Sequence, residues 1–282
     1  MMNPPIIILG APRSGTTILG EILSQHSDLH YMIEPNLTWH RYAGSESDYF
    51  DMRRMGNAIE PTRAQFEAEL LKSGKARLLE KTPQNCLRVP FVHSVFPDAK
   101  FIHIIRDGVE SSLSIAKYWQ TNTHGLGGVR LSQRLKEVSL RQLPRYGVQF
   151  LKRILPAGDT PRVFWGPVLP GMPGIVKALS IHEVAALQWR NCVEQATLYG
   201  RSLPDDQYME LRLEDFNEQA LLDILDFAQL SSEDSVVNAA KERFQSEQTS
   251  HRSGEANANE IESVMRWIQP TMQWLEQLDS RG

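Results

Sequence analysis

Cysteine is nearly absent from this chain: only Cys86 and Cys192 occur in its 282 residues. Their spacing matches no metal-binding motif and two cysteines are too few for a disulfide framework, so we expect two buried, reduced thiols in a cytoplasmic protein. Long apolar runs are absent as well. The N-terminal run at residues 6–9 is too short for the core of a signal peptide, and no stretch reaches the length of a membrane span.

The chain also lacks a surplus of basic residues. It has 30 Lys and Arg against 34 Asp and Glu, a formal net charge of −4, which argues against a sequence-independent nucleic-acid binder. A local basic pocket for a polyanionic small molecule is compatible with this balance. The length suits one α/β domain over residues 1–282, with a helical or loop insertion around residues 120–180 and a helical C-terminal segment at residues 217–282.

Apolar runs that read as strands alternate with periodic segments that read as helices. Strands are expected at residues 6–9, 29–33, 76–79, 100–105 and 207–211. Helices are expected at residues 16–23, 64–71, 89–96, 109–119 and 182–198, with an amphipathic stretch at 131–155, two further helices after residue 216 and a last one after a polar loop at 246–259. Residues 42–61 read as irregular. This alternation predicts a doubly wound parallel sheet flanked by helices.

A loop of the phosphate-binding type joins the first expected strand to the first expected helix. Residues 10–17 read Gly-Ala-Pro-Arg-Ser-Gly-Thr-Thr, and free backbone N–H groups meet the positive end of the helix dipole there. In a loop that handles ATP or GTP, a lysine follows the second glycine. Here Thr16 takes that position and Arg13 lies inside the loop. The sequence therefore predicts a P-loop-type fold without the standard apparatus for splitting a triphosphate.

Charged residues stand at the ends of the other expected strands. In parallel sheets the ligand lies beyond the carboxyl ends of the strands. The chain places Glu34, Lys81, Arg106 and Arg212 at these ends. One carboxylate and three cations beside a phosphate loop suit a multiply anionic ligand and one acid/base group.

Two motifs together resemble the sulfotransferases that use 3′-phosphoadenosine 5′-phosphosulfate (PAPS). Residues 10–17 are similar to the loop that binds the 5′-phosphosulfate in that family. Residues 106–114 are similar to its 3′-phosphate motif, in which an arginine ends a strand (Arg106) and a serine follows eight residues later (Ser114). The two motifs occur in the family's order and at a plausible separation.

Shorter segments resemble the bacterial and tyrosylprotein-type branches of the same family. They are Glu-Lys-Thr-Pro at residues 80–83, Leu-Gln-Trp-Arg at 187–190 and the segment at 208–216. The resemblance extends over residues 6–216 and fades in the C-terminal helices. It implies one α/β domain that binds PAPS and releases adenosine 3′,5′-bisphosphate.

The resemblance also implies which residues bind the donor. Backbone N–H groups of residues 13–17 and the hydroxyls of Thr16 and Thr17 would hold the 5′-phosphate, while Arg106 and Ser114 would hold the 3′-phosphate. The full set is Arg13, Ser14, Gly15, Thr16, Thr17, Arg106, Ser114, Arg212 and Arg252.

Two members of this set rest on weaker matches. The family often has a tyrosine after the arginine that corresponds to Arg212, where this chain has Leu213. Arg212 pairing instead with Glu214 or Asp215 is therefore an equal alternative. Arg252 rests on a match of only three residues.

The acceptor needs a general base. In the cytosolic small-molecule branch the base is a histidine two residues after the lysine, a position that Pro83 takes here. The tyrosylprotein-like branch uses a glutamate about twenty residues past the loop arginine, and Glu34 falls there. We expect Glu34 to act as the base and Lys81 to stabilise the leaving group.

The expected reaction is metal-independent, in-line transfer of a sulfuryl group to a hydroxyl, or less readily to an amine. Two alternatives stay open. One is a P-loop nucleotide kinase or NTPase, and Thr16 at the position of the P-loop lysine argues against it. The other is a non-catalytic nucleotide-binding protein, and the presence of Glu34 and Lys81 argues against that. The acceptor is not readable, because residues 42–61, 120–129 and 156–173, which should shape its pocket, follow no known pattern. The oligomeric state is open as well.

Overall fold

In the described part of the chain, five parallel strands form one sheet. A computed structural model describes residues 3–41, 47–49, 55–122, 166–249 and 257–280. Within these ranges the strand order is β2-β3-β1-β4-β5. The strands are β1 (Ile6–Leu9), β2 (Leu29–Ile33), β3 (Arg77–Lys81), β4 (Lys100–Ile105) and β5 (Tyr208–Arg212). The predicted doubly wound, P-loop-type parallel sheet is confirmed, and three strands have the predicted bounds.

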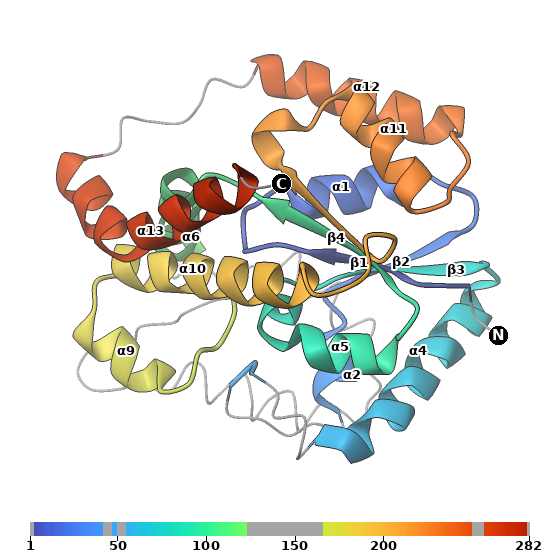
Figure 1. Cartoon of the computed structure of the whole chain (residues 1–282), viewed down its shortest axis with the longest axis horizontal. Helices are drawn as coiled ribbons and strands as arrows, with labels where there is room; N and C mark the ends of the chain where they lie inside the picture. Colours follow the sequence, from blue (N-terminus) through green and yellow to red (C-terminus); the bar gives the residue numbers. More distant parts are fainter. Residues whose placement is uncertain (1–2, 42–46, 50–54, 123–165, 250–256, 281–282) are drawn as a thin grey trace.

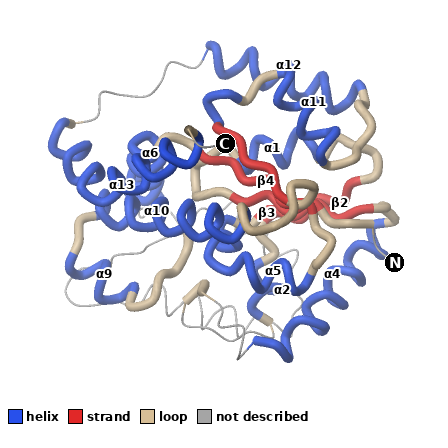
Figure 2. Tube along the Cα trace, viewed as in Figure 1, coloured by secondary structure: helices blue, strands red, loops and turns tan. Residues whose placement is uncertain are grey.

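Helices cover both faces of this sheet (Figures 1 and 2). One face packs against α1 (Thr16–Leu23), α11 (Glu218–Phe227) and α12 (Asp234–Thr249). The opposite face packs against α2 (Asn36–His40), α4 (Ile59–Ser73), α5 (Val89–Val95), α6 (Gly108–Asn122), α9 (Met172–Ala178), α10 (Ile181–Gly200) and α13 (Ala258–Asp279). Short 3-10 turns are η1 (Gly56–Ala58), η2 (Pro83–Arg88) and η3 (Leu213–Asp215).

Side chains of each strand alternate between two separate cores. Ile6 and Ile8 of β1 lie in the core with α1, α11 and α12, whereas Ile7 and Leu9 lie in the core on the other face. This follows from the two-residue repeat of a strand. Burial on both faces explains why the central strand β1 reads as a continuous apolar run rather than as an alternating one.

Two strand boundaries differ from the expected ones at positions that matter for the site. β3 includes Glu80 and Lys81, which the sequence analysis placed after the strand. Both side chains are buried, and polar partners from distant segments make their burial tolerable. β5 likewise extends by one residue to Arg212.

Other differences concern helices. α4 begins at Ile59, inside the stretch expected to be irregular, and α12 continues to Thr249, inside the expected polar loop. The short helices α2 and α9 were not expected, because five and seven residues are too few to show a helical period. The stretch at residues 131–155 lies outside the described residues, as does most of the insertion expected at 120–180. The elements described after η3 are all helices.

No helix in the described ranges combines the length and the apolar character needed to cross a bilayer. Both cysteines are buried and unbridged, as predicted.

Candidate active site

The register of the sheet brings Glu34 and Lys81 together. Lys81 ends β3 and aligns with Ile8 of β1 on one side and with Ile33 of β2 on the other. Glu34 follows Ile33, and its backbone N–H donates to the Lys81 carbonyl at 2.8 Å. Lys81 Nζ lies 2.9 Å from Glu34 Oε1. The predicted base and the predicted leaving-group stabiliser therefore form an ion pair at the ligand-binding edge of the sheet.

The ion pair is partly open to solvent. The Lys81 side chain is only 3% exposed, whereas that of Glu34 is 24% exposed. Glu34 has a φ of +50°, an uncommon conformation for a residue other than glycine, and it turns the chain from β2 towards α2. A residue held in such a conformation is fixed by its surroundings.

The phosphate loop is closed by its own hydrogen bonds. Ser14 donates to the Ala11 carbonyl from both its backbone N–H, at 3.2 Å, and its hydroxyl, at 2.7 Å. Ser14 is fully buried, so its hydroxyl supports the loop from within. The N–H of Gly10 donates to Cys86 Sγ at 3.1 Å and ties the start of the loop to η2.

The loop presents backbone N–H groups at the start of α1. Arg13 and Gly15 have φ angles of +68° and +88°, and alternation with residues of negative φ turns successive N–H groups to one side, as in anion-binding nests. The φ of +88° would strain any side chain at Gly15, and a Cβ there would also lie 2.5 Å from Leu213 Cδ1, so this position favours glycine. Within the described residues, no acceptor takes a hydrogen bond from the N–H groups of Arg13, Gly15, Thr16 and Thr17. This donor set suits a phosphate or a sulfate.

The second predicted motif contacts this loop directly. Arg13 Nε donates to the Ser114 hydroxyl at 3.1 Å, and Arg106 donates to the Arg13 carbonyl at 3.1 Å. Arg106 is also paired with Glu110 at 2.8 Å, and its own carbonyl accepts from the Trp189 indole at 3.1 Å. Two guanidinium groups and a serine hydroxyl, far apart in the sequence, thus gather beside the N-terminus of α1.

Arg212 has a partner that the sequence did not indicate. It pairs with Asp279 near the end of α13 at 2.7 Å, and Arg201 shares the same carboxylate at 2.9 Å. Glu214, one of the partners considered for Arg212, instead accepts from the N–H of Asp107 at 2.9 Å. Contact between Arg212 and a ligand stays a prediction. Arg252 lies outside the described residues.

A buried polar network beneath the ion pair was missed by the sequence analysis. Glu80 is fully buried, and its carboxylate accepts from the Trp39 indole at 2.9 Å, from the Thr82 hydroxyl and from Asn85 at 2.8 Å. Asn85 in turn accepts from Arg88 at 2.8 Å. The available signal was an acidic residue at the end of an otherwise apolar strand.

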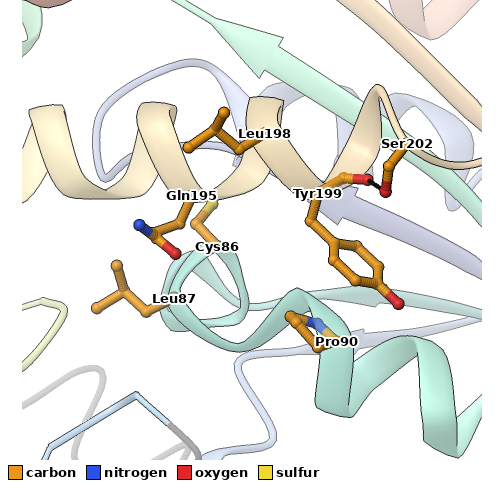
Figure 3. A pocket seen from close by; sticks show the side chains of 7 residues that line it. All are labelled: Cys86, Leu87, Pro90, Gln195, Leu198, Tyr199 and Ser202. Atoms are coloured by element: carbon orange, nitrogen blue, oxygen red, sulfur yellow. Dashed lines mark hydrogen bonds between the residues drawn. The ribbon is translucent and has the colours of Figure 1, made fainter.

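A separate cavity of about 240 Å³ lies between α10 and the η2–α5 segment (Figure 3). It is lined by Cys86, Leu87, Pro90, Gln195, Leu198, Tyr199 and Ser202. None of these residues is among the predicted site residues.

The parallel sheet, the loop at residues 10–17 and the strand-end ion pair together define a P-loop-like α/β protein. A sequence profile described as the Sulfotransferase family matches residues 4–157, just over half of the chain. This protein belongs to the sulfotransferase family.

Curated relatives match a limited stretch of the chain. The nodulation protein NoeE of Sinorhizobium fredii is 29% identical over 132 residues, which are 40% of this chain and 31% of NoeE. A putative protein-tyrosine sulfotransferase of Caenorhabditis briggsae is 31% identical over 129 residues, which are 40% of this chain and 45% of that protein. The matched stretch thus spans less than half of either relative.

Solved structures match nearly the whole chain. Sulfotransferase STF9 of Mycobacterium avium has a TM-score of 0.55 at 14% identity and covers 97% of this chain and 77% of its own. A sulfotransferase of Alicyclobacillus acidocaldarius has a TM-score of 0.52 at 16% identity, with coverages of 99% and 96%. At these identities the likeness is one of fold.

Proposed function

We propose that this protein transfers a sulfuryl group from PAPS to an acceptor hydroxyl by direct in-line displacement. The observation that carries the proposal is the Glu34–Lys81 ion pair at 2.9 Å, on the edge of the sheet where β1 enters the phosphate loop. Membership of the sulfotransferase family supports the reaction class. The donor, the acceptor type and the roles of the two residues are our inference.

The donor-binding residues suit a nucleotide with phosphate groups at two positions. The N–H groups at the start of α1 would bind the 5′-phosphosulfate. Arg106 and Ser114 would bind the 3′-phosphate, and Arg13 connects the two subsites through its contacts with both residues. Binding of the 3′-phosphate would compete with Glu110 for the Arg106 guanidinium.

The adjacency of Glu34 and Lys81 suits an in-line transfer. The attacking and leaving oxygens lie on opposite sides of one sulfur, so a base and a cation that are neighbours can serve one oxygen each. Glu34 takes the proton of the acceptor hydroxyl as that oxygen bonds to sulfur. The bond from sulfur to the bridging oxygen breaks, and the electron pair stays on that oxygen, beside Lys81.

Proton transfer also changes the charge balance of the pair. When Glu34 takes up the proton, Lys81 loses its anionic partner at the moment when negative charge develops on the leaving oxygen. The ammonium charge is then available to the product, adenosine 3′,5′-bisphosphate. Glu34 later releases its proton to solvent, and the pair is restored.

Calorimetric titration with adenosine 3′,5′-bisphosphate and with ATP, each with and without magnesium, tests the donor site. We expect binding of the bisphosphate that does not depend on magnesium and is much tighter than binding of ATP. Preference for magnesium-ATP would move the protein to the kinase or NTPase alternative. Binding of PAPS without transfer to any acceptor would favour the non-catalytic alternative.

Transfer is then measured from radiolabelled PAPS to a panel of hydroxyl probes: 4-nitrophenol, a simple sugar, and an acidic peptide that contains tyrosine. The peptide belongs in the panel because the Caenorhabditis briggsae relative is named as a protein-tyrosine sulfotransferase. Labelled product with any probe supports the proposed function and supplies the assay for the variants below.

The variant Arg106→Ala is expected to weaken binding of adenosine 3′,5′-bisphosphate by about 10- to 100-fold, as for loss of a charge-assisted hydrogen bond. Binding of adenosine 5′-phosphate should change far less, because that ligand lacks the 3′-phosphate. Calorimetry with both ligands makes the comparison. Arg243→Ala, which removes an exposed arginine paired with Glu21, is the control. Equal losses for both ligands would mean that Arg106 does not bind the 3′-phosphate.

A further inference from the structure

Glu80 precedes the predicted catalytic lysine and lies on the opposite face of the sheet. Leu78 of β3 is in the core beneath α5 and α10, and Leu79 is in the core beneath α1. By alternation, Glu80 points to the side of Leu78 and Lys81 to the side of Leu79. Glu80 therefore cannot touch ligands on the α1 side, and its influence on the reaction must act through the residues it holds.

The groups around Glu80 donate hydrogen bonds, so both carboxylate oxygens of Glu80 must accept them. Trp39 Nε1 and Arg88 Nε can only donate. Asn85 must present its oxygen to Arg88, at 2.8 Å, so it presents its NH₂ to Glu80 Oε2, also at 2.8 Å. Trp39 and Thr82 donate to the other carboxylate oxygen. The two groups that cannot accept, Trp39 Nε1 and Arg88 Nε, thus fix the direction of the bonds that Trp39, Asn85 and Arg88 make.

Burial and hydrogen bonding act on Glu80 in opposite directions. Burial raises the pKa of the Glu80 carboxyl to about 7, against the hydrogen bonds from Thr82 and Trp39 and the charges of Arg88 and Lys81. If the carboxyl takes up a proton, the Thr82 hydroxyl can turn from donor to acceptor. The network thus keeps all its partners in either protonation state.

The groups that bind Glu80 come from the two segments that border the ion pair. Trp39 belongs to α2, which begins two residues after Glu34, and Asn85 belongs to η2, which begins two residues after Lys81. The Glu34 turn itself is attached to β3 by the bond between its N–H and the Lys81 carbonyl. Glu80 is the point at which α2, η2 and the end of β3 are joined.

A second contact attaches α2 to the same network. His40, also on α2, lies 3.1 Å from Arg88 Nη1 and 3.0 Å from Asp48 Oδ1. Asp48 is buried, and its other carboxylate oxygen accepts from the N–H of Val168 at 2.7 Å. Arg88 is fully buried between Asn85 and this group. The buried charges are therefore compensated within the network.

We propose that Glu80 is a positioning residue for sulfuryl transfer: by joining α2, η2 and the end of β3, it holds Glu34 at hydrogen-bond distance from Lys81. This proposal rests on the proposed function, in which these two residues act on the transferred group. An error of about 1 Å in the placement of reacting groups lowers a rate by about 100-fold.

The decisive variant is Glu80→Gln. Glutamine has nearly the same shape, but its NH₂ must face either Trp39 Nε1 or the NH₂ of Asn85, and both of these donate. We expect kcat for transfer to fall by about 100-fold, while the affinity for adenosine 3′,5′-bisphosphate stays within about threefold. Glu69→Gln, at an exposed ion pair with Lys72, is the matched control and should change neither value.

The crystal structure of Glu80→Gln gives a readout that needs no activity. We expect Lys81 Nζ and Glu34 to have moved beyond hydrogen-bond distance. The proposal would be overturned if the variant kept the 2.9 Å contact between Lys81 Nζ and Glu34 Oε1, or if its kcat were unchanged. It would also be overturned if kcat and nucleotide affinity fell by the same factor. If wild-type protein neither binds the bisphosphate nor transfers from PAPS, the proposed function fails, and this structure still decides whether Glu80 holds the pair.

Trp39→Phe supplies a second variant in case Glu80→Gln does not fold. It removes the indole N–H that ties α2 to Glu80 and leaves the Thr82 and Asn85 bonds in place. Trp119→Phe is its control, because Trp119 is also buried and its indole has no hydrogen-bond partner among the described residues. A lower kcat in Trp39→Phe than in Trp119→Phe, at equal nucleotide affinity, supports the proposal. Equal values for the two variants contradict it.

Discussion

The variant Lys81→Met is expected to lower kcat for sulfuryl transfer by about 1000-fold, the effect of removing one preorganised charge from a developing oxyanion. Methionine keeps most of the length and the apolar stem of lysine, so the packing of β3 should survive. The Lys81 side chain is only 3% exposed, and a shielded charge interacts more strongly with a developing anion than a solvated one does. The measurement is the rate at saturating radiolabelled PAPS.

The chain offers a closely matched control in Lys100→Met. Lys100 is also a buried strand lysine, with a side chain 7% exposed, but it begins β4 and so lies at the opposite edge of the sheet. It should affect stability and leave kcat unchanged. If both variants lost activity equally, the loss in Lys81→Met would reflect damage to the sheet rather than a missing charge.

The double variant tests whether Lys81 and Glu34 act as one unit. Residues that act in a single chemical step give strongly non-additive effects. We therefore expect the double variant Lys81→Met with Glu34→Gln to be little slower than the slower single variant. Losses that multiply would show that the two residues serve separate steps.

The sequence could predict those parts of the fold and of the site that depend on interactions between residues close together in the chain. Buried parallel strands require continuous apolar runs, and the strand at residues 6–9 was predicted with its observed bounds. The tight loop at residues 10–17 requires glycine where φ is positive and space is short, as at Gly15. Residues at the strand ends, such as Glu34 and Lys81, follow from these strands together with the general rule for ligand binding in parallel sheets.

The parts that escaped prediction depend on contacts between distant segments. Glu80 lies 41 residues from Trp39, and Arg212 lies 67 residues from Asp279. A buried carboxylate at a strand end is unfavourable until its donors are known, so the sequence favoured an earlier end for β3. Helix α2 has only five residues and is held by Trp39 and His40 through the same network, which no periodicity reveals.

The variant Glu34→Gln is expected to lower kcat by about 1000-fold, within the range for loss of a general base. Glutamine retains the shape of the side chain and can still accept a hydrogen bond from Lys81, but it cannot take the proton of the acceptor. Nucleotide affinity should hold or increase slightly, because a negative charge leaves the edge of an anion site. The measurements are kcat with radiolabelled PAPS and calorimetry with adenosine 3′,5′-bisphosphate.

The control for this variant is Glu21→Gln, in which a partly exposed glutamate paired with Arg243 loses its charge away from the sheet edge. If Glu34→Gln retained transfer, another residue would be the base, and the first candidates would be His30 and His40, which flank Glu34 in the sequence. Of these, His40 already has its Nε2 within hydrogen-bond distance of both Arg88 Nη1 and Asp48 Oδ1, and this nitrogen can bond to one of them at a time. Lys81→Met should weaken nucleotide binding, whereas Glu34→Gln should leave it unchanged or make it tighter, and both variants should lose kcat to a similar degree. This pattern distinguishes a cation that binds the leaving group from a base that acts on the acceptor. Damage to a shared structural element would instead move both quantities in the same direction in both variants.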